Sequence, residues 1–225
     1  MRPAPRPAPS YAARLVVLAT ALVSALVPLA LPGPAAAAPL GRQSLLTLAE
    51  AETVYPQLRG RHDDGHRSVY AFGIDAPDFT TSPLHCDRYR SYRGTSRAQG
   101  YYYSLSGPAF AFTETLVRMR TTAEARAVLS HYRAFVRACS GTHATTDGEG
   151  GKATMKVRGW EPPRVGDERV GLLDAFIQYG DTTWRRTLLT RVGRTVLELV
   201  VEPRRGTGSA TRAVEAAELA LDKLG

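Results

Sequence analysis

The sequence predicts an α+β domain in which an antiparallel sheet is packed by two long helices, with one disulfide bond. Two capping boxes of the form Thr-x-x-Glu, beginning at Thr47 and Thr121, mark helix starts. Three runs rich in β-branched and aromatic residues, 170–179, 182–192 and 195–202, are separated by glycine-containing pairs typical of tight hairpin turns. Because hairpins dominate and no β-α-β rhythm is present, we expect the sheet to be antiparallel.

The start of the chain of 225 residues indicates export. Arginines precede an apolar run at 15–31, and small residues follow it at 34–38, which is the order of a secretory signal peptide. We therefore expect a signal peptide at 1–37, a tether at 38–44 and the folded domain at 45–225. An uncleaved anchor is the alternative, because the apolar run is about as long as a minimal membrane span.

A short helix is expected at the start of the domain. It opens at Thr47 and ends before Pro56, because proline cannot continue the hydrogen bonding of a helix. A charged stretch punctuated by glycine then predicts a loop, and runs of β-branched and aromatic residues predict strands. These expectations are a loop at 59–68 and strands at 69–72, 100–104 and 109–119.

A longer helix follows Thr121, and its apolar residues recur at helical spacing as far as Cys139. A polar, glycine-rich surface loop is expected at 143–151 and a strand at 153–157, before the three hairpin strands. The last helix starts near Ser209 and has one apolar stripe. We expect both long helices to pack on one face of the sheet and to leave the other face partly open.

Cys86 and Cys139 are the only cysteines, so a single pairing is possible. An exported protein meets an oxidising environment, in which such a pair forms a disulfide bond. Closing this loop would stabilise the folded domain by about 4 kcal/mol in the loop-entropy model. The alternative is a pair of free or metal-binding thiols, although two cysteines so far apart lack the spacing of a metal site.

Several stretches, taken in order, resemble a known family. They are the Leu-Leu-Thr run near Leu45, the isolated Cys86, the helix end at 131–139, the Val-Gly-Asp-Glu run at 165–168 and the hairpin at 191–200. Together they resemble the extracellular sensor domain of the mycobacterial PknH-type serine/threonine kinases. Similar domains also occur alone in exported actinobacterial proteins. The resemblance spans about residues 45–224.

The resemblance implies a mixed sheet with helices and a cleft for a ligand whose identity it does not give. Two features depart from the family. The kinase domains have a second disulfide bond for which this chain has no cysteines, and Phe135 stands where a tryptophan is often found. The family supplies no catalytic residues, so the resemblance implies no enzyme activity.

Three residues are candidates for contacting a ligand. Glu114 shares a face of its expected strand with apolar residues, so burial should raise the pKa of its carboxyl group unless an arginine neutralises it. A two-residue turn at 180–181 would set Trp184 opposite Ile177, so that Phe176 and Trp184 point to different faces. One of these aromatics could line a ligand cleft while the other packs under a helix.

These observations predict a secreted, extracellular, non-catalytic domain that is sensor-like or binds a ligand at the cell surface. The expected partner is an unknown small ligand or a component of the cell envelope. We expect no cofactor, metal or nucleic acid, and no membrane span after signal cleavage.

Two alternatives stay open. One is an envelope interaction protein that binds anionic wall polymer, because the chain is basic (formal net charge +8, or +5 without the three arginines of the predicted signal peptide) and arginines are interleaved with tyrosines at 88–103. The other, less favoured, is a secreted hydrolase whose chemistry would come from Glu114 or from the pair His62 and His66, which are residue types that can bind zinc.

Overall fold

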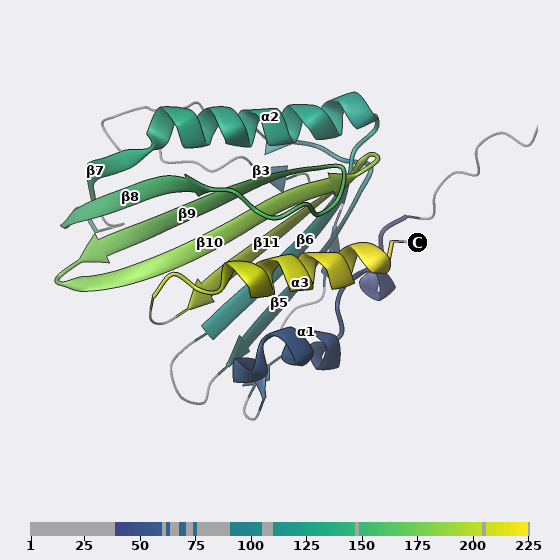
Figure 1. Ribbon diagram of the computed structural model, residues 1–225, viewed down its shortest axis with the longest axis horizontal. Coiled ribbons are helices and arrows are strands. Elements are labelled where there is room, and N and C mark those ends of the chain that lie inside the picture. The colour runs from purple at the N-terminus through teal and green to yellow at the C-terminus, as the bar shows by residue number, and fades with distance from the viewer. Residues whose placement is uncertain are drawn as a thin grey trace, which may run out of the picture. The chain divides into compact units, whose positions relative to one another are not determined.

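The centre of the fold is an antiparallel sheet of nine strands within the part of the chain that the computed structural model describes (Figure 1). Eight strands follow the order β1-β5-β6-β11-β10-β9-β8-β7, and β2 pairs with β5. The described residues are 39–59, 62–63, 68–70, 74–75, 91–104, 110–146, 149–203 and 206–224.

The strands agree with most of the sequence expectations, although β5 and β8 are longer than predicted. The strands of the main sheet are β1 (His62–Asp63), β2 (Ser68–Tyr70), β5 (Ser96–Ser104), β6 (Phe110–Arg118), β7 (Gly141–Thr146), β8 (Lys152–Trp160), β9 (Glu168–Gln178), β10 (Asp181–Val192) and β11 (Thr195–Pro203). A separate pair consists of β3 (Ile74–Asp75) and β4 (Ser91–Tyr92).

The helices begin where the capping signals predict. The described helices are η1 (Arg42–Ser44), α1 (Leu48–Val54), η2 (Pro56–Leu58), α2 (Thr122–Cys139) and α3 (Ala210–Asp222). The side chain of Thr47 accepts a hydrogen bond from the backbone of Glu50, and that of Thr121 accepts one from Glu124, so both capping boxes are confirmed. Within the described residues, no helix combines the length and the apolar character needed to cross a membrane.

The two long helices lie on opposite faces of the sheet. Successive residues of a strand point to opposite faces. Leu189 and Val196 belong to the cluster around α2, whereas their neighbours Leu188 and Leu197 belong to the cluster around α3. The expectation that both helices cover one face is therefore wrong. Since the central strands are apolar on both sides, a helix is needed on each. We call these sides the α2 face and the α3 face; α3 lies in front of the sheet in Figure 1.

Two segments expected to be loops contain strands. Within the predicted loop at 143–151, β7 extends to Thr146, which pairs with Lys152 of β8. Within the predicted loop at 59–68, His62 of β1 pairs with Ser104 of β5. Both strands are at the ends of the described strand order. An edge strand needs few apolar residues, so its composition resembles that of a loop.

The turn between β9 and β10 is displaced by one residue from the predicted position at 180–181. It consists of Tyr179 and Gly180, whose φ angles are 50° and 87°, and Gln178 pairs with Asp181. Positive φ at both central residues gives a backbone twist that matches the twist of the flanking strands. The turn therefore sets the register of the hairpin.

The first described residues pack against the sheet. Leu40 is 3% exposed, and its N–H donates a hydrogen bond to Ser96 Oγ over 3.3 Å. Residues 39–44, expected to be part of a tether, thus include a buried side chain and the short helix η1. The predicted signal peptide at 1–37 lies outside the described residues.

Cys139 is fully buried at the end of α2, and the described part of the chain contains no free cysteine. Its predicted partner, Cys86, lies outside the described residues. The position of Cys139 therefore agrees with the expectation that α2 ends against the core, and the pairing with Cys86 stays a prediction.

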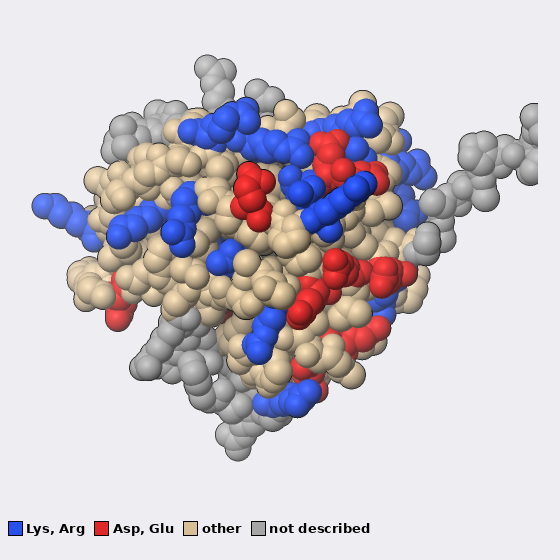
Figure 2. Space-filling model, viewed as in Figure 1, with Lys and Arg blue, Asp and Glu red and all other residues tan. Residues whose placement is uncertain are grey.

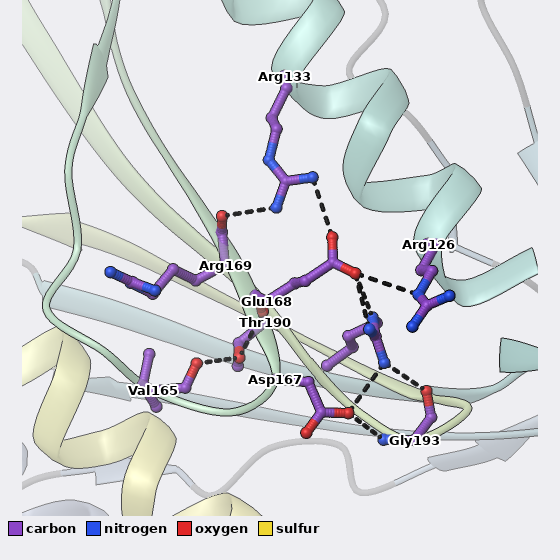
Figure 3. A network of polar contacts seen from close by, with 9 residues as sticks. Arg126, Arg133, Val165, Asp167, Glu168, Arg169, Thr190 and Gly193 are labelled. Carbon is purple, nitrogen blue, oxygen red and sulfur yellow. Dashed lines mark hydrogen bonds and ion pairs between the residues drawn. The ribbon is translucent and has the colours of Figure 1, made fainter. Parts of the chain in front are cut away.

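A network of ion pairs joins α2 to one end of the sheet (Figure 3). Glu168, the first residue of β9, accepts hydrogen bonds from Arg191 Nη2 over 2.7 Å and from Arg133 Nη1 over 3.1 Å, and Arg126 Nε lies 3.4 Å from the same carboxylate. Hydrogen bonding from Arg191 lowers the pKa of Glu168, while partial desolvation opposes that shift. The carboxylate is therefore held ionised between three cations.

Arg191 is the buried centre of this network, with 4% of its side chain exposed. Its Nη1 donates to Asp167 Oδ2 over 2.9 Å and to the carbonyl oxygen of Gly193 over 3.0 Å. Its Nε and Nη2 both donate to Glu168 Oε1. These contacts occupy all three nitrogens of the guanidinium, which indicates a structural role.

Replacing Arg191 with Met removes these donors and leaves two carboxylates without their buried partner. We expect the free energy of unfolding to fall by about 2–3 kcal/mol, because a partly buried charge then lacks compensation. The matched control is Arg126→Met, whose side chain is 64% exposed. It should cost less than about 1 kcal/mol. Urea unfolding measures both, and equal losses would contradict a dominant role for Arg191.

Candidate ligand-binding groove

The register of the hairpin places Trp184 on the α3 face. Trp184 lies opposite Ala175 instead of Ile177, so the predicted pairing is wrong by two positions. Phe176 lies opposite Thr183 and thus points to the α2 face. The expectation that the two aromatics point to different faces is confirmed, because the displacement of the turn preserves the alternation.

Two rows of side chains cross the α3 face near Trp184. The first row runs from Trp184 through Ala175 and Lys156 to Thr142, and the second places Arg158 opposite Leu173. Paired residues on adjacent strands point to the same face and are close neighbours. The sheet therefore brings an aromatic ring, two cations and apolar side chains together.

These rows form the walls and floor of a groove of about 460 Å³, which we call the Trp184 groove. A volume of this size falls within the range of about 300–1,000 Å³ that is usual for small-ligand sites. The side chains that line the groove include those of Ser140, Thr142, Lys156, Arg158, Leu173 and Trp184.

The groove lies beyond the N-terminal end of α3. Arg186 Nε donates to the carbonyl oxygen of Thr207 over 3.0 Å, so the segment that leads into α3 meets β10 at Arg186. Trp184, two residues earlier on the same face, is only partly buried. In Figure 2, basic side chains lie over this part of the sheet, whereas acidic side chains gather over α3 and α1.

Positive charge is concentrated at the Trp184 groove. The guanidinium of Arg158 lies over the Trp184 ring, 5.8 Å from its centroid, and that of Arg186 lies 4.8 Å from the centroid of Trp160. Burial lowers the pKa of Arg186, and repulsion from Arg158 lowers it further. Lys156 and Arg158 are exposed and form no ion pair with an acidic side chain among the described residues.

Phe176, the other aromatic candidate, is half-buried on the α2 face. Its strand neighbour Asp174 is 5% exposed and accepts a hydrogen bond from Arg185 Nε over 3.2 Å. Burial raises the pKa of Asp174, and the charge of Arg185 opposes that shift. Phe176 therefore lies beside a satisfied ion pair and does not share the Trp184 groove.

Glu114 is fully buried and holds the N-terminal segment. Its Oε2 accepts a hydrogen bond from the backbone N–H of Leu46 over 2.9 Å and lies 3.3 Å from the hydroxyl of Tyr102, whose single proton it shares with the carbonyl oxygen of Leu46. Its Oε1 has no hydrogen-bond partner. Burial raises the pKa of Glu114 to about 7, although both contacts lower it. The predicted shift is confirmed, and its cause is burial without a paired cation.

This position sets Glu114 apart from the groove. The residue lies on the α3 face of β6, beneath the segment that leads into α1, and is 0% exposed. A ligand would meet Glu114 only after Leu46 had moved. The sequence thus predicts the chemistry of Glu114, while its surroundings are those of a core residue.

A second groove of about 290 Å³ lies between α2 and the adjoining ends of β8 and β9, lined by Arg133, Arg137, Glu161 and Arg169 among others. Arg133 is already bonded to Glu168, and Glu161 brings negative charge. Figure 3 shows the side chain of Arg169 pointing away from the carboxylates of Asp167 and Glu168. The second groove is therefore less suited to an anion than the Trp184 groove.

The metal candidate of the sequence, His62 with His66, cannot be placed by its side chains, which lie outside the described part. Where side chains are described, no group of three or more His, Cys, Asp and Glu residues is arranged to hold a metal ion.

Sequence reasoning missed Lys156, Arg158 and Thr142 as lining residues. The signal was present, because Lys156, Arg158 and Trp160 alternate along one strand and Trp184 alternates with Arg186 along another. Such alternation places each set on one face of the sheet. The order of the strands brings the two sets together, and this order cannot be predicted from the alternating residues of either strand.

Comparison with known proteins supports the fold. No family model matches this sequence, and no curated protein matches it. The extracellular domain of PknH from Mycobacterium tuberculosis superposes with a TM-score of 0.56 and 10% identity, covering 83% of this chain and 99% of that chain. An uncharacterized protein from Mycobacterium smegmatis, an Rv0999 ortholog, has a TM-score of 0.38 and 12% identity, covering 79% and 96%, which is too low to bear on the fold.

The predicted resemblance to PknH-type sensor domains is therefore confirmed at the level of the fold. The class defined here is an α+β domain with the fold of the PknH extracellular domain and an open, cationic groove on its sheet.

Glu114 makes the stability of the domain depend on pH. Its pKa is about 7 in the folded protein and 4.5 as an unperturbed group. Its proton thus stabilises the fold fully below about pH 4.5, and this contribution is lost as the pH rises through 7. The free energy of unfolding of the unchanged protein should therefore fall by about 3 kcal/mol between about pH 5 and about pH 8.5. The variant Glu114→Gln should not show this fall, because the amide does not titrate.

Urea unfolding of both proteins at the two pH values measures this difference. The control is Glu202→Gln on the neighbouring strand β11, where the side chain is exposed. It should retain the pH dependence of the unchanged protein. If Glu114→Gln and the unchanged protein lose equal stability on alkalinisation, the buried carboxyl is not the source.

Proposed function

We propose that this chain is a secreted, non-catalytic, sensor-like domain that binds a ligand at the cell surface through the Trp184 groove. The observation that carries the proposal is the meeting of a partly exposed tryptophan with two cations that have no acidic partner among the described residues, in a groove of about 460 Å³. Ligand sites are typically concave and partly apolar, with a few polar groups that fix orientation.

The fold likeness supports the sensor part of the proposal. The PknH domain is the extracellular part of that protein. Transfer of a sensing role to this chain is an inference from a shared fold, and a fold can host more than one function. The groove adds an argument of its own, because its side chains come from this sequence.

The same side chains favour binding over catalysis. General acid–base chemistry needs a titrating group within reach of the substrate. The groove offers Lys156 and Arg158 as cations and hydroxyls at Ser140 and Thr142, with no carboxylate or histidine among the described side chains that line it. Glu114, the acid with a raised pKa, lies in the core instead.

A second candidate function is retention at the envelope by anionic wall polymer. Basic side chains along α2, including Arg126, Arg133 and Arg137, favour it (Figure 2). Glu168 already neutralises part of this charge through Arg126 and Arg133. Retention along α2 would be salt-sensitive and would not depend on Trp184, which separates the two candidates.

If the groove binds a ligand, a small molecule should co-purify with the secreted protein. Native mass spectrometry of the protein purified from its own culture medium should detect a bound small molecule. Trp184→Ala should lose it, because the apolar wall of the groove is removed. Phe176→Ala removes a half-buried aromatic from the opposite face of the adjacent strand and should retain it. Loss in Phe176→Ala alone would place the ligand on the α2 face and contradict the proposal.

We also propose that the mature protein begins near Ala38 and contains a Cys86–Cys139 disulfide bond. The buried position of Cys139 at the end of α2, and the absence of a free cysteine among the described residues, support this pairing. Intact mass of the secreted protein should match cleavage after Ala37. Denatured, unreduced protein should take up no iodoacetamide, and reduction should expose two thiols. Labelling before reduction, or a retained N-terminal segment, would contradict the proposal.

A further inference from the structure

We propose that the Trp184 groove binds an anionic carbohydrate, with a sugar ring against Trp184 and its carboxylate or phosphate group at Lys156 and Arg158. The inference rests on the proposed function and names the class of ligand. Three features of the groove support it: its available cations, the apolar surface beside them and its polar rim.

The cations of the groove are available, unlike the buried arginine of the ion-pair network. All three nitrogens of the Arg191 guanidinium donate to protein oxygens. Lys156 and Arg158, by contrast, are exposed and have no acidic partner within the described part of the chain. The lining side chains include no carboxylate. An anion entering the groove would meet two cations without displacing an internal ion pair.

The apolar surface beside these cations suits one face of a sugar ring. Trp184 is partly exposed, while Leu173 and Ala175 beneath it are almost fully buried. The C–H face of a pyranose is apolar, and burying it against an indole is favourable. Because Trp184 and Lys156 occupy the same row of the sheet, separated by Ala175, the ring contact and the charge contact are side by side.

The rim of the groove offers partners for hydroxyl groups. Ser140 and Thr142 are exposed at the rim; the Ser140 hydroxyl donates to the carbonyl oxygen of Val136 over 2.6 Å, so it meets a ligand as an acceptor. Gly141, between them, begins β7, the last strand in the described order of the sheet. An edge strand has backbone N–H and C=O groups on its outer side that the sheet does not use. A ligand with several hydroxyls fits this combination better than a simple inorganic anion does.

Isothermal titration calorimetry with three matched probes tests the ligand class. The probes are a trisaccharide of galacturonic acid, a phosphorylated maltotriose and unmodified maltotriose. At least one charged probe should bind about tenfold or more tightly than the neutral one, and added salt should weaken it. The uronate and phosphate arms distinguish the two sources of the anion.

Variants locate the binding. The double variant Lys156→Gln with Arg158→Gln should weaken the charged probe by about tenfold or more, which is about 1.4 kcal/mol. Phe176→Ala should leave it unchanged. Both replaced cations are exposed, so the fold should persist. Equal binding of neutral and charged probes, or binding indifferent to the double variant, would overturn the inference.

Failure of this inference can be told apart from failure of the proposed function. If none of the three probes binds but the native mass still shows a ligand that depends on Trp184, the carbohydrate class is wrong and the proposed function stands. If the co-purified mass is also absent or independent of Trp184, both are wrong.

Discussion

The pairing of Glu168 with Arg191 is the contact on which the rest of the structure depends. These residues lie directly opposite each other at the first rung of the β9–β10 ladder, and the turn at Tyr179 and Gly180 closes its other end. A slip of one residue would turn every side chain to the opposite face. The ion pair and the turn therefore keep Trp184 on the α3 face, although Arg191 lies at the far end of the strand.

Arginine has two roles at this sheet. Arg191 and Arg186 on β10, and Arg133 on α2, donate to internal oxygens and hold segments together, whereas Arg158 contacts the ring of Trp184 and has no acidic partner among the described residues. The difference follows from position, because the first three lie where a loop or helix meets the strands, whereas no described element crosses the sheet at Arg158. Formal net charge, +8 for the whole chain, does not distinguish these roles.

Local patterns predicted the helices, the C-terminal hairpins and the chemistry of Glu114, because each depends on a few neighbouring residues. The distribution of helices over the two faces depends on strand order. The adjacent apolar residues Leu188 and Leu189 show that both faces of β10 need cover, but not which helix supplies it. The edge strand β7 has the composition of a loop, so it is recognised as a strand mainly by its pairing with β8. Lys156 and Arg158 become a site only through that order.

The anchoring of Leu46 has a mechanical consequence. The backbone N–H of Leu46 donates to Glu114, and its C=O accepts from the hydroxyl of Tyr102 over 2.5 Å. Both backbone polar groups of Leu46 are therefore hydrogen-bonded inside the core. A pulling force applied to the chain before Leu46 would therefore act directly on the sheet and would not be taken up by a flexible linker. The stiff point at Leu46 thus lies a few residues after Leu40, whose N–H donates to Ser96 of β5.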